Sequence, residues 1–172
     1  IGTGTGRVLE LYGRHLRHGF GIDLSREMLA VARANLERAG LSSSQVRRAD
    51  MDRLPVEDER FDAAVFHQVL HYSDTPAAAI AEAARALKPG GRLAIVDFLP
   101  HDVESLRTEH AHRRLGFADG EVGDWLRAAI WACRRTWLAR VDSPTKSLSV
   151  KIEDRAPTMR CTSRPSARSS GS

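Results

Sequence analysis

The sequence predicts an α/β domain built on a doubly wound, mostly parallel sheet. Glycines alternate at positions 2, 4 and 6, directly before a segment of helical periodicity. An acidic residue, Asp23, ends the apolar run that follows this segment. Short apolar runs then alternate with helical patterns as far as about residue 133. This alternation implies right-handed crossovers between parallel strands, with helices on both faces of the sheet.

The first elements follow from periodicity and from capping residues. Apolar residues recur at helical spacing from Arg7 to about Leu16, and residues 19–22 form a short strand. Ser25 is a suitable N-cap for a helix over 26–39, which Gly40 ends. The expected buried face of this helix consists of Met28, Leu29, Ala32 and Leu36.

The middle of the chain continues the alternation. Residues 46–49 form a short strand pattern, and the continuous apolar run within 61–66 predicts a strand that is covered on both faces. A helix then begins with Thr75 as its cap and Pro76 at its first position. The sequence Pro-Gly-Gly, starting at Pro89, is expected to end this helix.

The last elements begin with the clearest strand, residues 92–98, which has an acidic residue, Asp97, at its exit. Helices are expected at 102–115, a segment rich in charge and histidine, and at 122–133. Two strand-like runs, 135–141 and 147–152, can pair as a closing antiparallel hairpin.

The positive charge of the chain is confined to its C-terminal part. Residues 134–172 hold nine Lys and Arg against three Asp and Glu, whereas residues 1–133 hold 17 against 19. Residues 154–172 contain almost no apolar side chains and predict a basic, Ser/Arg-rich disordered tail behind a domain at 1–153. Because the domain itself is not basic, we expect no specific nucleic-acid partner.

Other features of the whole chain exclude several classes of protein. No apolar run reaches the roughly 18 residues of a membrane span, and no signal pattern opens the sequence. Cys133 and Cys161 lack the spacing of a zinc site or a disulfide framework. His110 and His112 would face different directions on a helix and predict no metal site. We therefore expect a cytoplasmic protein without a membrane partner.

The alternating glycines favour a ligand-binding loop. Glycine lets the backbone approach a ligand closely, and the first amides of the following helix are free to bind it. A dinucleotide loop would need glycine at position 7, where this chain has Arg7, which disfavours NAD and flavins. Asp23, 17 residues after Gly6, can accept hydrogen bonds from two ribose hydroxyls or can cap the next helix.

Two further stretches can contact a nucleoside ligand. Asp50 can accept a hydrogen bond from an adenine amino group while Met51 packs on the ring, or Asp50 can be a solvated loop residue. His67 follows the strand at 61–66 and can serve as a base near neutral pH or as a ligand contact. His71 is a further candidate at the same strand end.

Several of these motifs together resemble the class I S-adenosylmethionine-dependent methyltransferases, which have a Rossmann-like fold. The resemblance covers residues 1–130 and rests on Gly2-Thr3-Gly4-Thr5-Gly6, Gly21-Ile22-Asp23-Leu24-Ser25, Asp50-Met51, Phe61-Asp62-Ala63-Ala64-Val65 and Leu87-Lys88-Pro89-Gly90-Gly91-Arg92-Leu93. It implies methyl transfer from S-adenosylmethionine to a small-molecule substrate, with His67 as the candidate catalytic residue. The cofactor-binding residues that it implies are Gly2, Thr3, Gly4, Gly6, Asp23, Leu24, Met28, Asp50, Met51, His67 and Gln68.

A narrower resemblance concerns the runs at 67–72 and 109–117, which are similar to bacterial methyltransferase domains carried behind an ArsR-type winged helix. The alternative function is therefore an S-adenosylmethionine sensor without turnover. In the family, a central strand precedes the glycine loop, and this sequence begins where that strand would end. We expect an N-terminally truncated, unstable domain in which the strands at 19–22 and 63–66 face each other across a gap.

Overall fold

The computed structural model describes residues 1–132, 138–145 and 147–153. Its helices are α1 (Arg7–Tyr12), α2 (Arg26–Arg38), α3 (Pro76–Ala86), α4 (Ser105–His110) and α5 (Asp119–Ala132), with 3-10 turns η1 (Gly13–His15) and η2 (Leu70–Tyr72). Its strands are β1 (Gly19–Asp23), β2 (Ser44–Arg48), β3 (Phe61–His67), β4 (Leu87–Phe98), β5 (Leu138–Thr145) and β6 (Ser147–Glu153). No helix in these ranges is long and apolar enough to cross a membrane. The tail expected at 154–172 lies outside the described residues, so the division into domain and tail stays a prediction.

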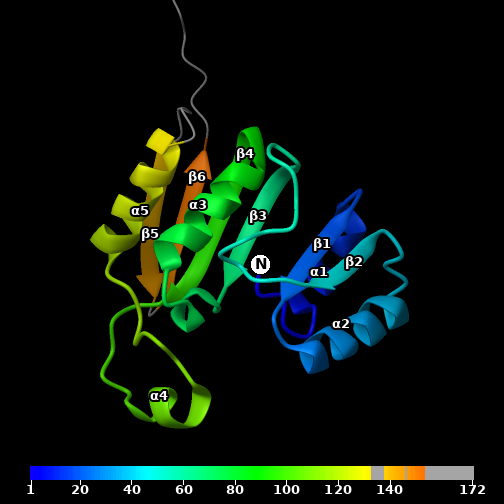
Figure 1. Ribbon diagram of the computed structural model, residues 1–172, viewed down its shortest axis with the longest axis horizontal. Helices are drawn as coiled ribbons and strands as arrows, with labels where there is room; N and C mark the ends of the chain where they lie inside the picture. The colour runs from blue at the N-terminus through cyan, green and yellow to red at the C-terminus, as the bar shows by residue number, and fades with distance from the viewer. Residues whose placement is uncertain (133–137, 146, 154–172) are drawn as a thin grey trace, which may run out of the picture.

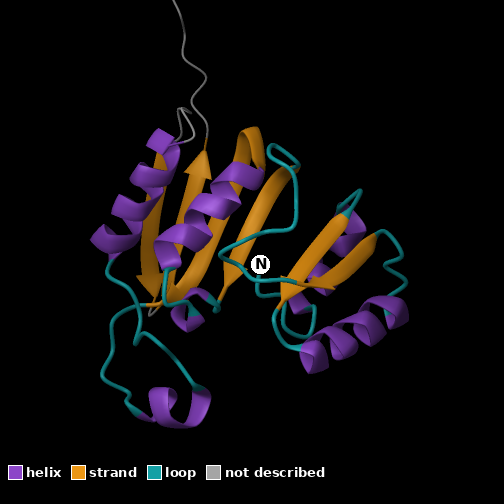
Figure 2. Cartoon of the chain, in the orientation of Figure 1, coloured by secondary structure: helices purple, strands orange, loops and turns teal. Residues whose placement is uncertain are grey.

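The strands form two sheets, which Figure 2 shows next to each other. The smaller sheet pairs β1 with β2 in parallel, and the larger sheet has the order β3-β4-β6-β5. β3 and β4 are parallel, whereas β6 runs antiparallel to both β4 and β5. The predicted α/β fold and the C-terminal hairpin are thus confirmed, and β6 is the hairpin strand that pairs with β4.

Residues 1–3 lie in the seam between the two sheets, where Figure 1 marks the N-terminus. The α-amino group of Ile1 donates to the Val65 carbonyl of β3 at 2.8 Å, and Thr3 N donates to the Ile22 carbonyl of β1 at 2.7 Å. No strand of the described residues pairs with the facing edges of β1 and β3. The expected gap between these two strands is therefore present in the structure.

The main hydrophobic core lies between the larger sheet and helices α3 and α5, which cover one face of it (Figure 1). Its fully buried large side chains are Phe66, Leu70, Ile80, Leu87, Leu93, Ile95, Phe117 and Leu126. Among them, Phe66 and Ile95 belong to the carboxyl halves of β3 and β4, and Leu70 belongs to the turn after β3. The turns that follow the two strands are consequently held on a close-packed base.

Two predictions about burial were wrong. β3 was expected to be covered on both faces, but Ala63 is exposed and only Phe66 of this strand is buried. The reason is that α3 and α5 cover one face of the larger sheet. Met28 was expected on the buried face of α2 but is 46% exposed. The other three residues of the predicted face, Leu29, Ala32 and Leu36, are buried as expected.

The predicted cap and stop residues are confirmed at both ends of α2, whereas the cap predicted at the start of α3 is not formed. Ser25 Oγ accepts a hydrogen bond from Met28 N at 3.1 Å, and Gly40 follows α2 with a φ of 68°. Thr75 precedes α3 but makes no capping bond with its side chain. Its hydroxyl donates to Asp52 instead, because that carboxylate lies within reach.

Helices α3 and α4 are shorter than predicted. α3 ends at Ala86 rather than at Pro89, because Leu87 already pairs with Phe61 of β3. α4 covers only part of the expected helix at 102–115, because Ala111 adopts a left-handed conformation with a φ of 55°. The chain turns back towards η2 after this residue.

Candidate functional site

In the glycine loop, residues 1–6, neighbouring atoms surround Gly2 closely, whereas the space beside Gly4 is free. Both glycines have positive φ, 62° and 54°. A Cβ at Gly2 would overlap the side chain of Val69, whereas a Cβ at Gly4 would meet no atom within 4 Å. A ligand can therefore approach the backbone closely at Gly4, as a cofactor loop requires. Thr3 and Gly6, the other residues predicted here, belong to the same turn, in which Gly6 N donates to the Thr3 carbonyl at 2.8 Å.

Asp23 joins the glycine loop to the end of β1. Its Oδ2 accepts a hydrogen bond from Gly4 N at 2.8 Å, and its Oδ1 accepts one from Ser25 N at 2.9 Å. A carboxylate has about four lone-pair sites, so Asp23 retains the capacity to accept hydrogen bonds from two hydroxyl groups. Leu24 and Met28 are 52% and 46% exposed and offer apolar surface to a ligand bound here.

The Asp50–Met51 turn begins next to Asp23, because Ala49 N donates to the Asp23 carbonyl at 3.1 Å. Asp50 is exposed, and its Oδ1 accepts a hydrogen bond from Asp52 N at 3.1 Å. Met51 is half-buried and packs against the hydrophobic core. The structure thus places an exposed carboxylate and an apolar side chain beside the end of β1 that carries Asp23.

β3 ends with His67, which is followed by Gln68, and both side chains are exposed. Gln68 has a φ of 52°, which is uncommon for a residue other than glycine. Its backbone N–H is held by the Val96 carbonyl at 2.7 Å. The chain therefore turns sharply at the carboxyl edge of the sheet, where open α/β sheets bind ligands.

A buried pair lies behind this edge, formed by His71 and Asp97. His71 Nδ1 and Asp97 Oδ1 are 2.7 Å apart, and the two side chains are 2% and 0% exposed. Asp97 also accepts hydrogen bonds from the backbone nitrogens of Val69, Leu70 and Phe98 at 3.1, 2.9 and 2.9 Å. Asp97 was not among the predicted site residues, and the signal in the sequence was its place at the exit of the clearest strand.

The ring of His112 covers the ring of His71. Their centroids are 4.0 Å apart with 30° between the planes, and Arg113 N and Arg114 N both donate to the His71 carbonyl. His112 is 8% exposed, and its Nδ1 has no hydrogen-bond partner in the described part of the chain. Burial, and next the neighbouring His71, lower the pKa of His112.

The lowered pKa of His112 predicts that the fold loses stability in mild acid. The unfolded chain binds the proton more tightly than the folded chain, so this contribution is present above about pH 6.5 and is lost as the pH falls towards the lowered value. His112→Phe keeps a stacked ring without the titrating nitrogen. Urea unfolding between about pH 7.5 and 5 should therefore give a smaller pH slope for this variant than for the wild type.

His18→Phe is the matched control for this experiment, because it removes an exposed imidazole from the loop before β1. Equal pH slopes for the wild type and His112→Phe would contradict the assignment to His112.

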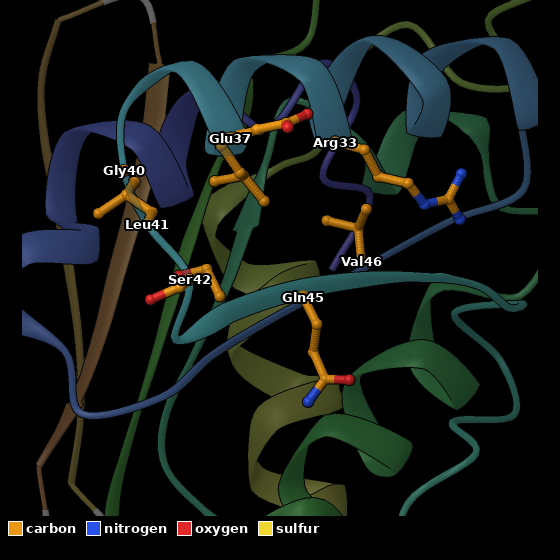
Figure 3. Close-up of a pocket in the computed structure, with 9 residues that line it drawn as sticks. Arg33, Glu37, Gly40, Leu41, Ser42, Gln45 and Val46 are labelled. Atoms are coloured by element: carbon orange, nitrogen blue, oxygen red, sulfur yellow. The ribbon is translucent and has the colours of Figure 1, made fainter.

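A cavity of about 440 Å³ lies elsewhere, between the end of α2 and β2 (Figure 3). It is lined by Arg33, Leu36, Glu37, Gly40, Leu41, Ser42, Ser44, Gln45 and Val46. None of the predicted site residues lines this cavity. The predicted ligand site is therefore the open carboxyl edge around the glycine loop and not this depression.

Known proteins share the segment that carries this site. A family model described as a methyltransferase domain matches residues 1–95, just over half of the chain. A phosphatidylethanolamine N-methyltransferase of Cereibacter sphaeroides is 37% identical over 103 residues, which are 59% of this chain and 50% of that protein. A ubiquinone biosynthesis O-methyltransferase of Xylella fastidiosa is 34% identical over 93 residues, 54% of this chain and 38% of that protein. The chain thus matches half or less of the length of these two relatives.

Solved structures share the fold. An S-adenosylmethionine-dependent methyltransferase from Mesorhizobium loti superposes with a TM-score of 0.73 at 20% sequence identity, and the match covers 88% of each chain. The Rossmann-like architecture predicted from the motifs is thereby confirmed. The glycine loop that is open at Gly4 and the carboxylate of Asp23 beside it fit the cofactor of this fold. The chain belongs to the family of methyltransferase domains.

Proposed function

We propose that this chain transfers the methyl group of S-adenosylmethionine to a small-molecule acceptor. The observation that carries the proposal is the glycine loop, which is open at Gly4 and is bonded at that same residue to the carboxylate of Asp23. Bound S-adenosylmethionine supplies an activated methyl group. The task of the chain is therefore to hold donor and acceptor in line and to exclude water.

Each side of the loop is assigned to one part of the cofactor. The backbone of residues 2–6 faces the methionine portion, and Asp23 accepts hydrogen bonds from the ribose hydroxyls. Asp50 accepts a hydrogen bond from the adenine amino group, and the apolar surface for the ring comes from Leu24, Met28 and Met51. His67 and Gln68 lie at the end of β3 and are assigned to the side where donor and acceptor meet.

Acceptor recognition is assigned to residues 99–117. The family model matches only residues 1–95, and two relatives that share this part are named for nitrogen and oxygen methylation. We therefore assign residues 1–95, which these relatives share, to binding of S-adenosylmethionine, and the segment beyond them to the acceptor. The segment that follows β4 returns to η2 through the hydrogen bonds of Arg113 and Arg114 and so reaches the same edge of the sheet.

The narrower similarity to methyltransferase domains of ArsR-type regulators is also a proposal. It rests on the runs at 67–72 and 109–117, which are in direct contact in the structure. His112 stacks on His71, and the two residues after His112 donate to the His71 carbonyl. The two runs thus form one structural unit, which supports a shared role for them.

Asp23→Ala is expected to weaken S-adenosylmethionine binding by about 1.5–3 kcal/mol, roughly 10- to 150-fold, because charge-assisted hydrogen bonds to the ribose are lost. Titration calorimetry with S-adenosylmethionine measures this change. Asp124→Ala is the control, since it removes an exposed carboxylate that pairs only with Arg127 of the same helix among the described residues. Unchanged affinity of Asp23→Ala would disprove the cofactor assignment. Failure of the wild type to form S-adenosylhomocysteine with any acceptor would disprove methyl transfer.

A further inference from the structure

The buried pair of His71 and Asp97 has the arrangement of a base and its orienting group. A carboxylate only accepts hydrogen bonds, so the 2.7 Å contact requires that His71 Nδ1–H donates to Asp97. The lone pair of the neutral ring is then on Nε2. A ring nitrogen that is held in this tautomer by a fixed carboxylate is the usual design of a general base.

Asp97 is itself fixed in place by the backbone. Its two oxygens accept hydrogen bonds from three backbone N–H groups in addition to the imidazole. Two of these N–H groups belong to Val69 and Leu70, which directly precede His71. The carboxylate therefore sets both the position and the tautomer of the His71 ring.

The pair also adjoins the cofactor loop. The side chain of Val69 occupies the space in which a Cβ of Gly2 would lie, and Val69 N is one of the groups that Asp97 holds. His71 follows two residues later. The backbone that carries the ring is therefore linked to the loop that is assigned to the methionine portion of the cofactor, and His112 stacks on the ring from the segment 99–117.

Two buried ring nitrogens of this cluster have no hydrogen-bond partner among the described residues. His112 Nδ1 is buried without a hydrogen-bond partner in the described part of the chain, on a ring that stacks directly on His71. His101 Nε2, on the same returning segment, is likewise buried without a partner in these residues. Buried polar atoms are nearly always paired, so these nitrogens indicate a polar ligand at the cluster.

We propose that His71, positioned by Asp97, accepts the proton of a hydroxyl-bearing methyl acceptor, and that His112 Nδ1 bonds a second polar group of the same molecule. This inference rests on the proposed function. The acceptor oxygen bonds to the methyl carbon while the carbon–sulfur bond breaks and its electrons stay on sulfur. The hydroxyl proton moves to His71 Nε2, and the imidazolium that forms pairs with Asp97. His67, the candidate base that the resemblance implies, lies exposed at the end of β3, whereas His71 has a buried orienting partner.

The test uses catechol as a hydroxyl acceptor and N,N-dimethylaniline as an acceptor that has no proton to lose. Nitrogen-15 NMR of the full chain bound to S-adenosylhomocysteine should show His71 protonated at Nδ1 and bare at Nε2. Catechol should shift the ring signals of both His71 and His112. These readouts need neither turnover nor a variant, and a His71 that is protonated at Nε2, or rings that catechol leaves unshifted, would overturn the proposal.

Turnover supplies the second test. His71→Gln and Asp97→Asn should lower methylation of catechol about 100-fold or more while S-adenosylmethionine affinity changes less than twofold. His15→Gln, an exposed histidine of η1, is the control and should retain wild-type rates. Equal catechol turnover by His71→Gln and the wild type would disprove the role of His71 as the base and leave the proposed methyl transfer intact. Methylation of N,N-dimethylaniline without catechol turnover would keep the proposed function and reject a hydroxyl acceptor.

Discussion

Asp97→Ala is expected to destabilise the fold by about 3–5 kcal/mol, the usual cost of removing one partner of a buried pair. The carboxylate is completely buried and holds four hydrogen-bond donors, including His71 Nδ1 at 2.7 Å. Alanine leaves these donors buried without an acceptor. Since a whole domain is stable by about 5–15 kcal/mol, urea unfolding should show a transition at much lower denaturant concentration, or none.

The matched control is Asp62→Ala. Asp62 also forms an ion pair, with Lys88 at 2.8 Å, but its side chain is 86% exposed. Exposed ion pairs contribute little to stability, so this variant should unfold close to the wild type. Similar losses for the two alanine variants would mean that burial of Asp97 does not matter to the fold. Asp97→Asn, which retains an acceptor oxygen, should fall between the wild type and Asp97→Ala.

Gly2→Ala and Gly4→Ala are expected to fail in different ways. At Gly2 the new methyl group would overlap Val69 and the residue would keep a φ of 62°, so we expect a loss of stability of about 2–5 kcal/mol from overpacking and backbone strain together. At Gly4 there is no overlap within 4 Å, and only strain of about 1–2 kcal/mol remains. The methyl group at Gly4 enters the space assigned to the cofactor, however, so affinity for S-adenosylmethionine should fall at least tenfold.

Thermal unfolding and titration calorimetry of the two glycine variants separate these effects. Gly40→Ala is a control for strain alone, because Gly40 has a φ of 68°, open surroundings and a place at the far end of α2. It should lose as much stability as Gly4→Ala and keep full affinity for the cofactor. Full affinity of Gly4→Ala would show that the open face of the loop is not where the cofactor lies.

Local signals predicted the helix and strand ends around the glycine loop well. Asp23 at the end of an apolar run, Ser25 as a cap and Gly40 as a stop each act within a few residues of chain, and each has its expected place in the structure. The parallel strands and the closing hairpin followed from periodicity in the same way. The exposure of Met28 was missed because it lies at the edge of the helix stripe next to the buried Leu29, and apolar character alone does not distinguish the two residues.

The histidine cluster could not be predicted from local signals. Asp97 and His71 are 26 residues apart in sequence, and His112 comes from a third segment. The sequence predicts one helix over this third segment, residues 102–115. On such a helix His110 and His112 would face different directions, and nothing in the pattern would place His112 on His71. The left-handed turn at Ala111 ends α4 early, and tertiary contacts with η2 decide where His112 lies.

The seam between the two sheets has a thermodynamic consequence. The proposed ligand site is divided by it, since Asp23 ends β1 on one side and Gln68 follows β3 on the other. Among the described residues, the backbone of residues 1–3 supplies one direct hydrogen bond to each of the facing strands. In the free chain, we expect the amide protons of the smaller sheet to exchange with solvent before those of the larger one. A cofactor that contacts both sheets stabilises their association by its binding free energy. We therefore expect the two sheets to unfold in separate steps in the free chain and in one cooperative transition when the chain is saturated with cofactor.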